Sequence, residues 1–222
     1  MIKISNDLKL TYPNAKFGIL IIKDVVNLPN HTEFIKTKTL ITENLLKKYE
    51  NYDRKEFVKS EPVCFYKDYY KKFKKTYPVL LQLESIVVKA NPLPNASTLV
   101  ESMFIAELKN MLLTAAHDFD KIQFPLQLQL SQGNESFIGI SGREQFTTAN
   151  DMMLSDDNGI ISSILNGPDH RTQVASSTKN VVFYVYAPNG VEDDTITNHL
   201  KDIISYVSIF SPDAKVDLLD IF

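Results

Sequence analysis

His117 is the histidine whose neighbours best suit it for chemistry. It follows Ala115 and Ala116, two small residues that leave room for a ligand, and it precedes Asp118 and Asp120, whose carboxylates could orient its ring or raise its pKa. Its position after a predicted helix also suits a surface histidine that caps a helix end. The two aspartates lack further metal ligands at useful spacing, which favours a solvated turn over a metal site. The residues alone leave the role of His117 open.

A second polar cluster, residues 166–172, places an acid, a base and a guanidinium side by side in Asp169, His170 and Arg171. By composition this cluster is a polar turn. The chain has no glycine-rich phosphate loop, no G-x-S-x-G motif and no Cys or His pairs spaced for zinc. Its seven glycines leave little material for phosphate-binding loops, which argues against ATP-driven chemistry. We predict no cofactor and no bound metal, and the motifs identify no catalytic residue.

Positive charge is concentrated in one part of the chain. Residues 36–75 carry 12 Lys/Arg against 6 Asp/Glu, a net +6, whereas residues 101–222 carry 7 against 17, a net −10. Within the basic part, residues 66–75 interleave lysines with aromatic rings, a combination that binds phosphates and stacks bases. An amphipathic helix with a solvated lysine face has the same composition. The candidate RNA-binding residues are Lys71, Lys72, Lys74 and Lys75.

Hydrophobic periodicity predicts the elements that position these residues. A β-branched apolar run predicts a buried strand at 17–22, and apolar residues at helical intervals predict helices at 32–50 (after a Thr32 cap), 61–75, 78–90, 98–113 and 192–210. Alternating runs between turn residues predict strands near 127–130, 137–140, 151–154 and 181–186. The expected fold class is α+β, with helices mainly in the first half packed on a mostly antiparallel β-sheet system in the second half.

Bulk composition limits the class of protein. The chain has 222 residues, 44% of them hydrophobic and 23% charged, which is typical of one globular domain. The net charge of −3 argues against a protein that coats nucleic acid. No run of eighteen apolar residues is present, and the first residues lack the apolar core of a signal peptide, so we expect a cytoplasmic protein with no membrane partner. The single cysteine, Cys64, is expected to be a packing residue.

The order of several segments resembles a known family. Two pairs of segments are similar to motifs of the B-three/B-four domain of the phenylalanyl-tRNA synthetase β subunit. The first pair is Leu99-Val100-Glu101 followed by residues 115–122, and the second is Ser155-Asp156-Asp157-Asn158-Gly159-Ile160 followed by residues 178–183. The likeness extends from about residue 60 onward, and more weakly over the strand-helix start. It implies one tRNA-binding domain over 1–222, with 1–60 as a strand-helix N-terminal extension and a stand-alone form without aminoacylation machinery.

In that family the domain resembles a proofreading site that hydrolyses tyrosine wrongly esterified to phenylalanine tRNA. The resemblance places His117 on the pocket histidine, Ser162 and Ser163 near the small-residue pocket wall, and Asp169 on the glutamate that recognises the substrate hydroxyl, with His170 as its substitute if the register differs by one. We therefore expect His117, Ser162, Ser163, Asp169 and His170 to converge on one concavity.

Two departures keep the function open. Phe104 stands where the family usually has Asn, and a Gly-Gly pair is reduced to Gly167-Pro168. Three functions remain: an aminoacyl-tRNA ester hydrolase that acts in trans on an aminoacylated tRNA, a non-catalytic RNA-binding module, and a small-molecule or protein-interaction domain without RNA. Ester hydrolysis needs only a positioned water, donors for the oxyanion and a close-fitting pocket, so the missing motifs do not separate these alternatives. The sequence names neither the tRNA, the amino acid nor the oligomeric state.

Overall fold

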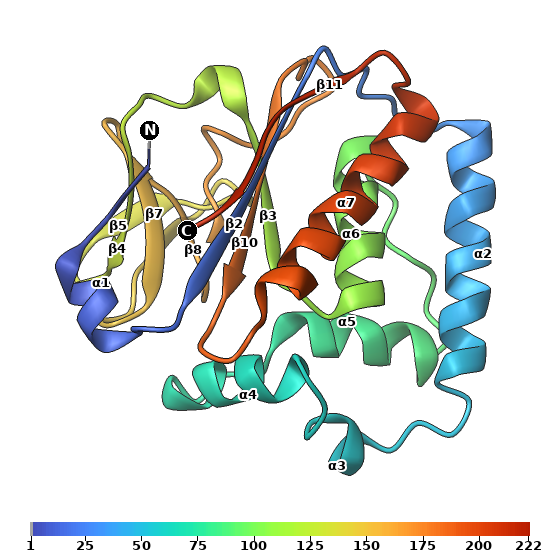
Figure 1. The fold of residues 1–222 in the computed structure, drawn as a ribbon, viewed down its shortest axis with the longest axis horizontal. Helices are drawn as coiled ribbons and strands as arrows, with labels where there is room; N and C mark the ends of the chain where they lie inside the picture. The colour runs from blue at the N-terminus through green and yellow to red at the C-terminus, as the bar shows by residue number, and fades with distance from the viewer. Residues whose placement is uncertain (1) are drawn as a thin grey trace.

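The apolar run at 17–22 forms β2 (Lys16–Lys23), an inner strand of a four-stranded antiparallel sheet in the computed structural model, which describes residues 2–222. All six residues of the run are buried because both faces of this sheet are covered (Figure 1). The sheet has the order β11-β2-β10-β3, with β3 (Thr114–Asp118) at one edge, β10 (Val181–Ala187) beside it and β11 (Lys215–Ile221) at the other edge.

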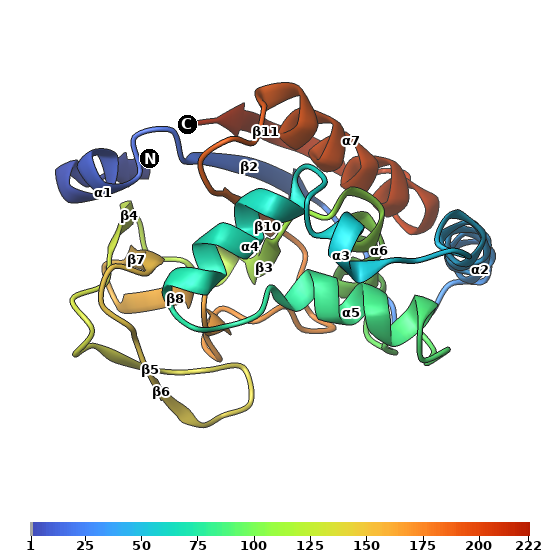
Figure 2. The same cartoon turned by 90° about the horizontal axis from the view of Figure 1, so that it is seen from below.

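A second, five-stranded sheet covers one face of the first (Figure 1). Its order is β1 (Ile2–Ile4), β4 (Leu126–Leu130), β7 (Met152–Asp156), β8 (Gly159–Ser163) and β9 (Gly167–Pro168). All pairings are antiparallel except that of β1 with β4. A separate hairpin of β5 (Ser136–Ile138) and β6 (Glu144–Phe146) projects from this sheet in Figure 2.

Helices cover the other face of the four-stranded sheet. There α6 (Thr98–Asn110) packs against α7 (Asp193–Phe210), and α2 (Thr32–Lys48) lies outside them. At one end of the sheet lie α4 (Val63–Lys72) and α5 (Pro78–Val87), which Figure 2 shows in front of the strands. The shorter elements are α1 (Asn6–Thr11), α3 (Arg54–Phe57) and the 3-10 helix η1 (Phe119–Lys121).

The predicted fold class is confirmed, since helices dominate the first half and mostly antiparallel strands the second. Three local predictions were wrong. Thr32 begins α2 rather than capping it, and the N-cap residue His31 makes no side-chain capping bond. Met111 takes a left-handed conformation (φ 55°), which ends α6 at Asn110 instead of residue 113. The chain then runs extended, so that His117 lies inside β3 and not at a helix end.

Candidate functional site

His117 and Asp169 are joined by Thr172 in a buried hydrogen-bonded chain. The Thr172 hydroxyl donates to Asp169 Oδ1, which also accepts the Thr172 N–H at 3.1 Å. Since that hydroxyl has one proton, His117 Nδ1–H donates to Thr172 Oγ1 at 2.7 Å. The two polar clusters of the sequence therefore meet, through a threonine that the sequence did not single out.

This arrangement keeps the His117 imidazole neutral. Burial, with a smaller contribution from the nearby Arg171 guanidinium, lowers the pKa of His117 to about 3. With its proton on Nδ1, the ring has an accepting nitrogen at Nε2, which is buried and has no hydrogen-bond partner among residues 2–222. The centroid of the Tyr184 ring lies 5.8 Å from that of the His117 ring. The buried Tyr184 hydroxyl also has no hydrogen-bond partner among residues 2–222.

Arg171 ties this segment to the five-stranded sheet. Its guanidinium contacts both carboxylate oxygens of Asp156, at 2.8 and 3.0 Å, and donates to the Lys121 carbonyl at 3.0 Å. Asp156 also accepts the backbone N–H groups of Gln123 and Asn158, both at 2.9 Å. The acid-rich turn of the sequence thus anchors the loop that carries Asp169, a structural role that leaves little of the Asp156 carboxylate free for a ligand.

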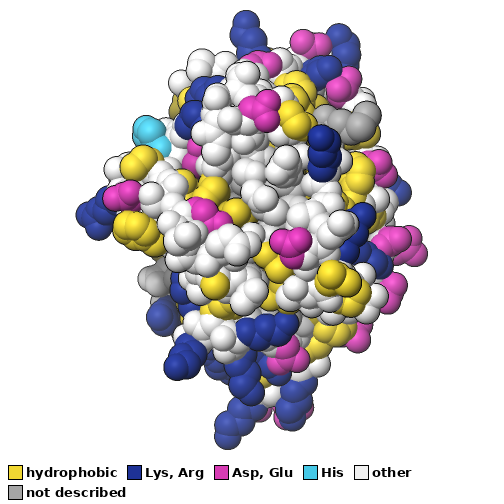
Figure 3. All heavy atoms as spheres, turned by 90° about the vertical axis from the view of Figure 1, so that its left-hand side faces the viewer, with side chains coloured by type: hydrophobic (Ala, Val, Ile, Leu, Met, Phe, Trp, Pro, Cys, Tyr) yellow, Lys and Arg dark blue, Asp and Glu magenta, His cyan; other side chains and the backbone are white. Residues whose placement is uncertain are grey.

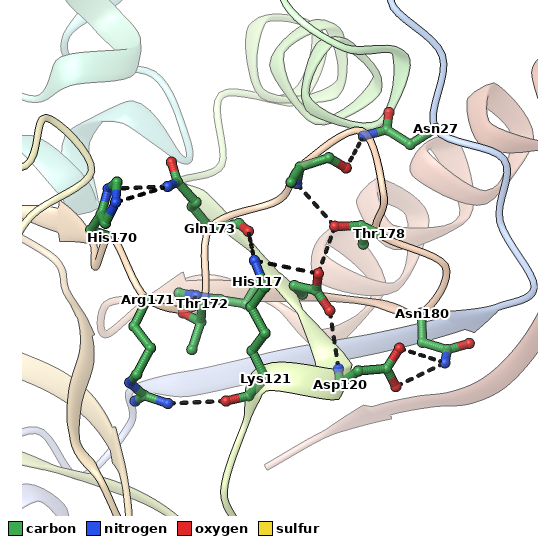
Figure 4. Close-up of polar contacts among 12 residues, drawn as sticks. Asn27, His117, Asp120, Lys121, His170, Arg171, Thr172, Gln173, Thr178 and Asn180 are labelled. Atoms are coloured by element: carbon green, nitrogen blue, oxygen red, sulfur yellow. Dashed lines mark hydrogen bonds and ion pairs between the residues drawn. The ribbon is translucent and has the colours of Figure 1, made fainter.

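The other predicted pocket residues lie in three different environments. Ser162 is buried and its hydroxyl bonds to the hydroxyl of Tyr186. Ser163, which points to the opposite side of β8, lines a cavity. His170 is exposed and contacts the Gln173 side-chain amide at 3.0 Å, apart from the His117 chain (Figure 4).

The cavity that Ser163 lines lies at the edge of β3 opposite β10, between that strand, α5, α6 and the β8–β9 segment, with a volume of about 290 Å³. We call it the α6 cavity. Its lining residues are Gln82, Val100, Met103, Phe104, Glu107, Leu113, Thr114, Ala115, Ala116, Ile140, Ser163, Ile164, Gly167, Pro168, Val174 and Tyr186.

The structure therefore brings only some of the predicted residues together. Of the five predicted residues, Ser163 alone lines the α6 cavity, and Asp169 is occupied by Thr172. The physical reason is the alternation along β3, which turns His117 toward the interior between the sheets.

Backbone groups of β3 also face the α6 cavity. The N–H of Thr114 bonds to Glu107 and that of Asp118 bonds to the Thr172 carbonyl, so both point away from β10. Because N–H groups of an antiparallel strand alternate in direction, the N–H of Ala116 points to this same edge. Ala116 lines the cavity, so this donor lies at the cavity wall.

Glu107 is the residue of this site that the sequence analysis missed. Its side chain is 2% exposed, and one carboxylate oxygen accepts the Thr114 N–H at 2.7 Å. Burial raises the pKa of Glu107 to about 8, against the opposing effect of that N–H. The sequence marks Glu107 only as an acid among the apolar positions of a predicted helix. An acid on the solvated face of a helix gives the same pattern.

The lysine-aromatic stretch divides into a buried and an exposed part. Tyr66, Tyr69 and Tyr70 are buried, and the Tyr70 hydroxyl donates to the Ile164 carbonyl at 2.8 Å. These rings form the core under α4 and are not free to stack bases, which corrects that part of the interpretation. The exposed part consists of the lysines Lys71, Lys72, Lys74 and Lys75.

One of the exposed lysines, Lys75, lies close to the α6 cavity. Lys75 Nζ is 3.5 Å from the Leu165 carbonyl and 3.4 Å from Asn166 Oδ1, in the segment between the lining residues Ile164 and Gly167. Figure 3 shows lysine and arginine side chains gathered at the lower end of the molecule, where α4 lies. This basic surface therefore reaches the segment beside the cavity through Lys75.

Residues 2–222 contain neither a metal-binding cluster nor a membrane-spanning helix. No cluster of three or more His, Cys, Asp or Glu side chains suited to a metal ion lies within this range. None of the helices described there has the length and apolar character required to cross a membrane.

Comparison with known proteins defines the family. Residues 64–207 match the model of the B3/4 domain, and the chain belongs to this family. Its fold is similar to the crystal structure of an N-terminal fragment of the phenylalanyl-tRNA synthetase β subunit from Pyrococcus horikoshii, with a TM-score of 0.50 and 12% sequence identity. That match covers 100% of this chain and 53% of the fragment, so the chain spans about half its length. No curated protein sequence matches significantly.

Proposed function

We propose that the chain binds an aminoacylated tRNA and hydrolyses its ester, with the amino acid in the α6 cavity. The α6 cavity carries this proposal, because it combines a volume of about 290 Å³ with a mainly apolar lining at the edge of a strand. A volume of that size accommodates an amino-acid side chain and part of the ester. Such a substrate would place the protein in the cytoplasm, where tRNA is charged.

The chemistry requires no nucleophile from the protein. Hydrolysis of an activated ester proceeds by attack of water, and the protein lowers the barrier by holding the ester and by donating hydrogen bonds to the oxyanion. The N–H of Ala116 is our candidate donor, because it points to the cavity edge and its strand is fixed by β10 on the other side. Ser163, on the opposite wall, is a candidate contact of the substrate side chain.

The buried His117 chain has a positioning role in this proposal. Thr172 links His117 in β3 to Asp169, which directly follows Gly167-Pro168 on the cavity wall. Both sides of the cavity are thereby held at a fixed separation. A neutral His117 suits this role, since a buried charged imidazole would need a counter-charge.

The lysines supply the docking surface for the tRNA backbone. Lys71, Lys72, Lys74 and Lys75 are exposed, and Lys75 lies next to the segment that leads into the cavity wall. Phosphates bound there would bring the acceptor end of the tRNA to the cavity mouth. The α6 cavity and the lysine docking surface would then bind two parts of one substrate.

The test is deacylation of a panel of charged tRNAs, with Tyr-tRNA(Phe) among several mischarged species, and gel-shift binding of the uncharged tRNAs in parallel. We expect at least one charged tRNA to lose its amino acid faster than in buffer alone, and an excess of RNase-free carrier protein to have no effect. Binding without any hydrolysis would overturn the editing proposal. Neither binding nor hydrolysis would also remove RNA as the partner.

A non-catalytic RNA-binding module is the second candidate, and Phe104 favours it. This ring lines the α6 cavity at the position where the family usually has the polar Asn. An apolar ring there neither orients a water molecule nor donates a hydrogen bond to the ester. The deacylation panel separates this candidate from the first, since it predicts tRNA binding with no hydrolysis.

A further inference from the structure

Two side-chain oxygens in the α6 cavity have no hydrogen-bond partner among residues 2–222. One carboxylate oxygen of Glu107 accepts the Thr114 N–H. The other carboxylate oxygen makes no hydrogen bond within residues 2–222. Gln82, on α5, has a buried Oε1 with no partner in that range. Both residues line the same cavity. A buried acceptor without a donor costs free energy, so a ligand that brings donors to this place is favoured.

No cation among residues 2–222 neutralises Glu107. The nearest lysines in sequence and on the adjoining helix are paired elsewhere, Lys109 with Asp202 at 2.7 Å and Lys38 with Glu101. No basic side chain contributes to the pKa of Glu107. The cavity therefore presents an acid without a counter-ion.

The rest of the lining describes the remainder of the ligand. Apolar side chains form most of the wall, namely those of Val100, Met103, Phe104, Leu113, Ile140, Ile164 and Val174. Such a wall accepts a hydrocarbon or aromatic body and offers nothing to a second charge. The complementary ligand has an apolar body and one group that donates several hydrogen bonds.

We propose that the α6 cavity binds the ammonium group of a primary amine with an apolar body, with Glu107 as counter-ion and Gln82 Oε1 as second acceptor. An ammonium group has three N–H donors and a positive charge, which match both acceptors. This inference rests on the proposed function only in naming the physiological amine, which would be the α-amino group of the esterified amino acid. Binding of a free amine requires neither RNA nor hydrolysis.

The proposal predicts that amine binding releases a proton. In the free protein the pKa of Glu107 is raised to about 8, so the carboxyl is mostly protonated at neutral pH. The titratable groups that face it are Tyr66 and Tyr70 of α4 and Tyr77 before α5, whose pKa values burial raises well above 10. They stay neutral up to about pH 9 and do not contribute. Affinity should rise about tenfold per pH unit below 8 and level off above it.

The experiment compares phenethylamine with 2-phenylethanol, its neutral counterpart of similar shape, by calorimetric titration from about pH 6 to about pH 9. An alkylammonium of this kind keeps its charge over that range, since amines such as that of Lys titrate near 10.4. We expect the amine to bind at least about tenfold more tightly than the alcohol at the upper end, with the pH slope given above.

Two variants complete the test. Glu107→Gln keeps an acceptor for the Thr114 N–H, and it should weaken the amine at least about tenfold and remove the pH slope, with the alcohol unaffected. Glu43→Gln, at an exposed site of α2, should behave like wild type. Equal affinity for amine and alcohol, an amine affinity independent of pH, or no amine binding would overturn the inference. Deacylation of tRNA by the same sample would show that the proposed function stands without it.

Discussion

Replacing Glu107 with glutamine isolates the effect of one buried carboxyl on folding. The pKa of Glu107 rises from 4.5, its ordinary value, to about 8 because the side chain is buried. Between these values the folded protein keeps a proton that the unfolded chain loses, so the contribution of Glu107 to stability falls as pH rises. Each pH unit in this window corresponds to about 1.4 kcal/mol. Above about 8 both states are ionised and the slope ends.

The assay is urea unfolding of wild type and Glu107→Gln from about pH 5 to about pH 9. The free energy of unfolding of the variant minus that of wild type should increase by about 1.4 kcal/mol per unit up to 8 and then stay constant. Burial lowers the pKa of His117 to about 3 and that of His199 to about 4, which destabilises both proteins equally below 6.5 and cancels in the difference. A difference independent of pH would refute the placement of Glu107 in an uncompensated, desolvated site.

Other predictions follow from the same contacts. Thr172→Val should lower the free energy of unfolding by about 1–3 kcal/mol in urea titrations, because His117 Nδ1 and Asp169 lose a buried partner. Thr172→Ser should recover most of that stability. Equal stability of the two variants would contradict the hydrogen-bonded chain from His117 through Thr172 to Asp169. Changing Lys71, Lys72, Lys74 and Lys75 to Ala should weaken tRNA binding and lower the slope of log affinity against log salt by about 0.7–0.9 per lost phosphate contact. The exposed set Lys3, Lys89, Lys179 and Lys201 serves as its control, and an equal loss in both sets would remove the docking surface. Gly190→Ala should lower the melting temperature, since φ is +109° and a Cβ would lie 2.4 Å from the Phe65 ring; an unchanged melting temperature would show that this turn relaxes freely.

The sequence predicts the long regular elements well and the short ones poorly, for reasons of pattern. The apolar residues of α7 recur with the helical period of 3.6 residues. The run Val181–Ala187 is continuously apolar, as expected of a buried strand. By contrast β3 contains two alanines, a threonine and two polar residues, which carry no strand signal by themselves, and its conformation depends on pairing with β10. The edge strand β11 is largely exposed, so little hydrophobic alternation marks it.

The candidate site was predictable only where a resemblance connected distant segments. His117 and Asp169 lie far apart in sequence, and the resemblance alone suggested that they meet. Thr172, which joins them, and Glu107, which faces the cavity, follow from tertiary packing that no local pattern records. The tyrosines of α4 show the opposite case, since a pattern that suggests base stacking serves the core instead.

The most direct test of the account is the deacylation rate of a protein whose α6 cavity is filled. Met103 lines the cavity and is partly exposed, so Met103→Trp should occupy the space with little strain on the core. Leu10→Trp, at a side chain that is 83% exposed, is the matched control. We predict that Met103→Trp, with an unchanged melting temperature and unchanged tRNA affinity, loses the hydrolysis that wild type and Leu10→Trp share. Hydrolysis at the wild-type rate by the filled protein would contradict the assignment of the cavity as the site.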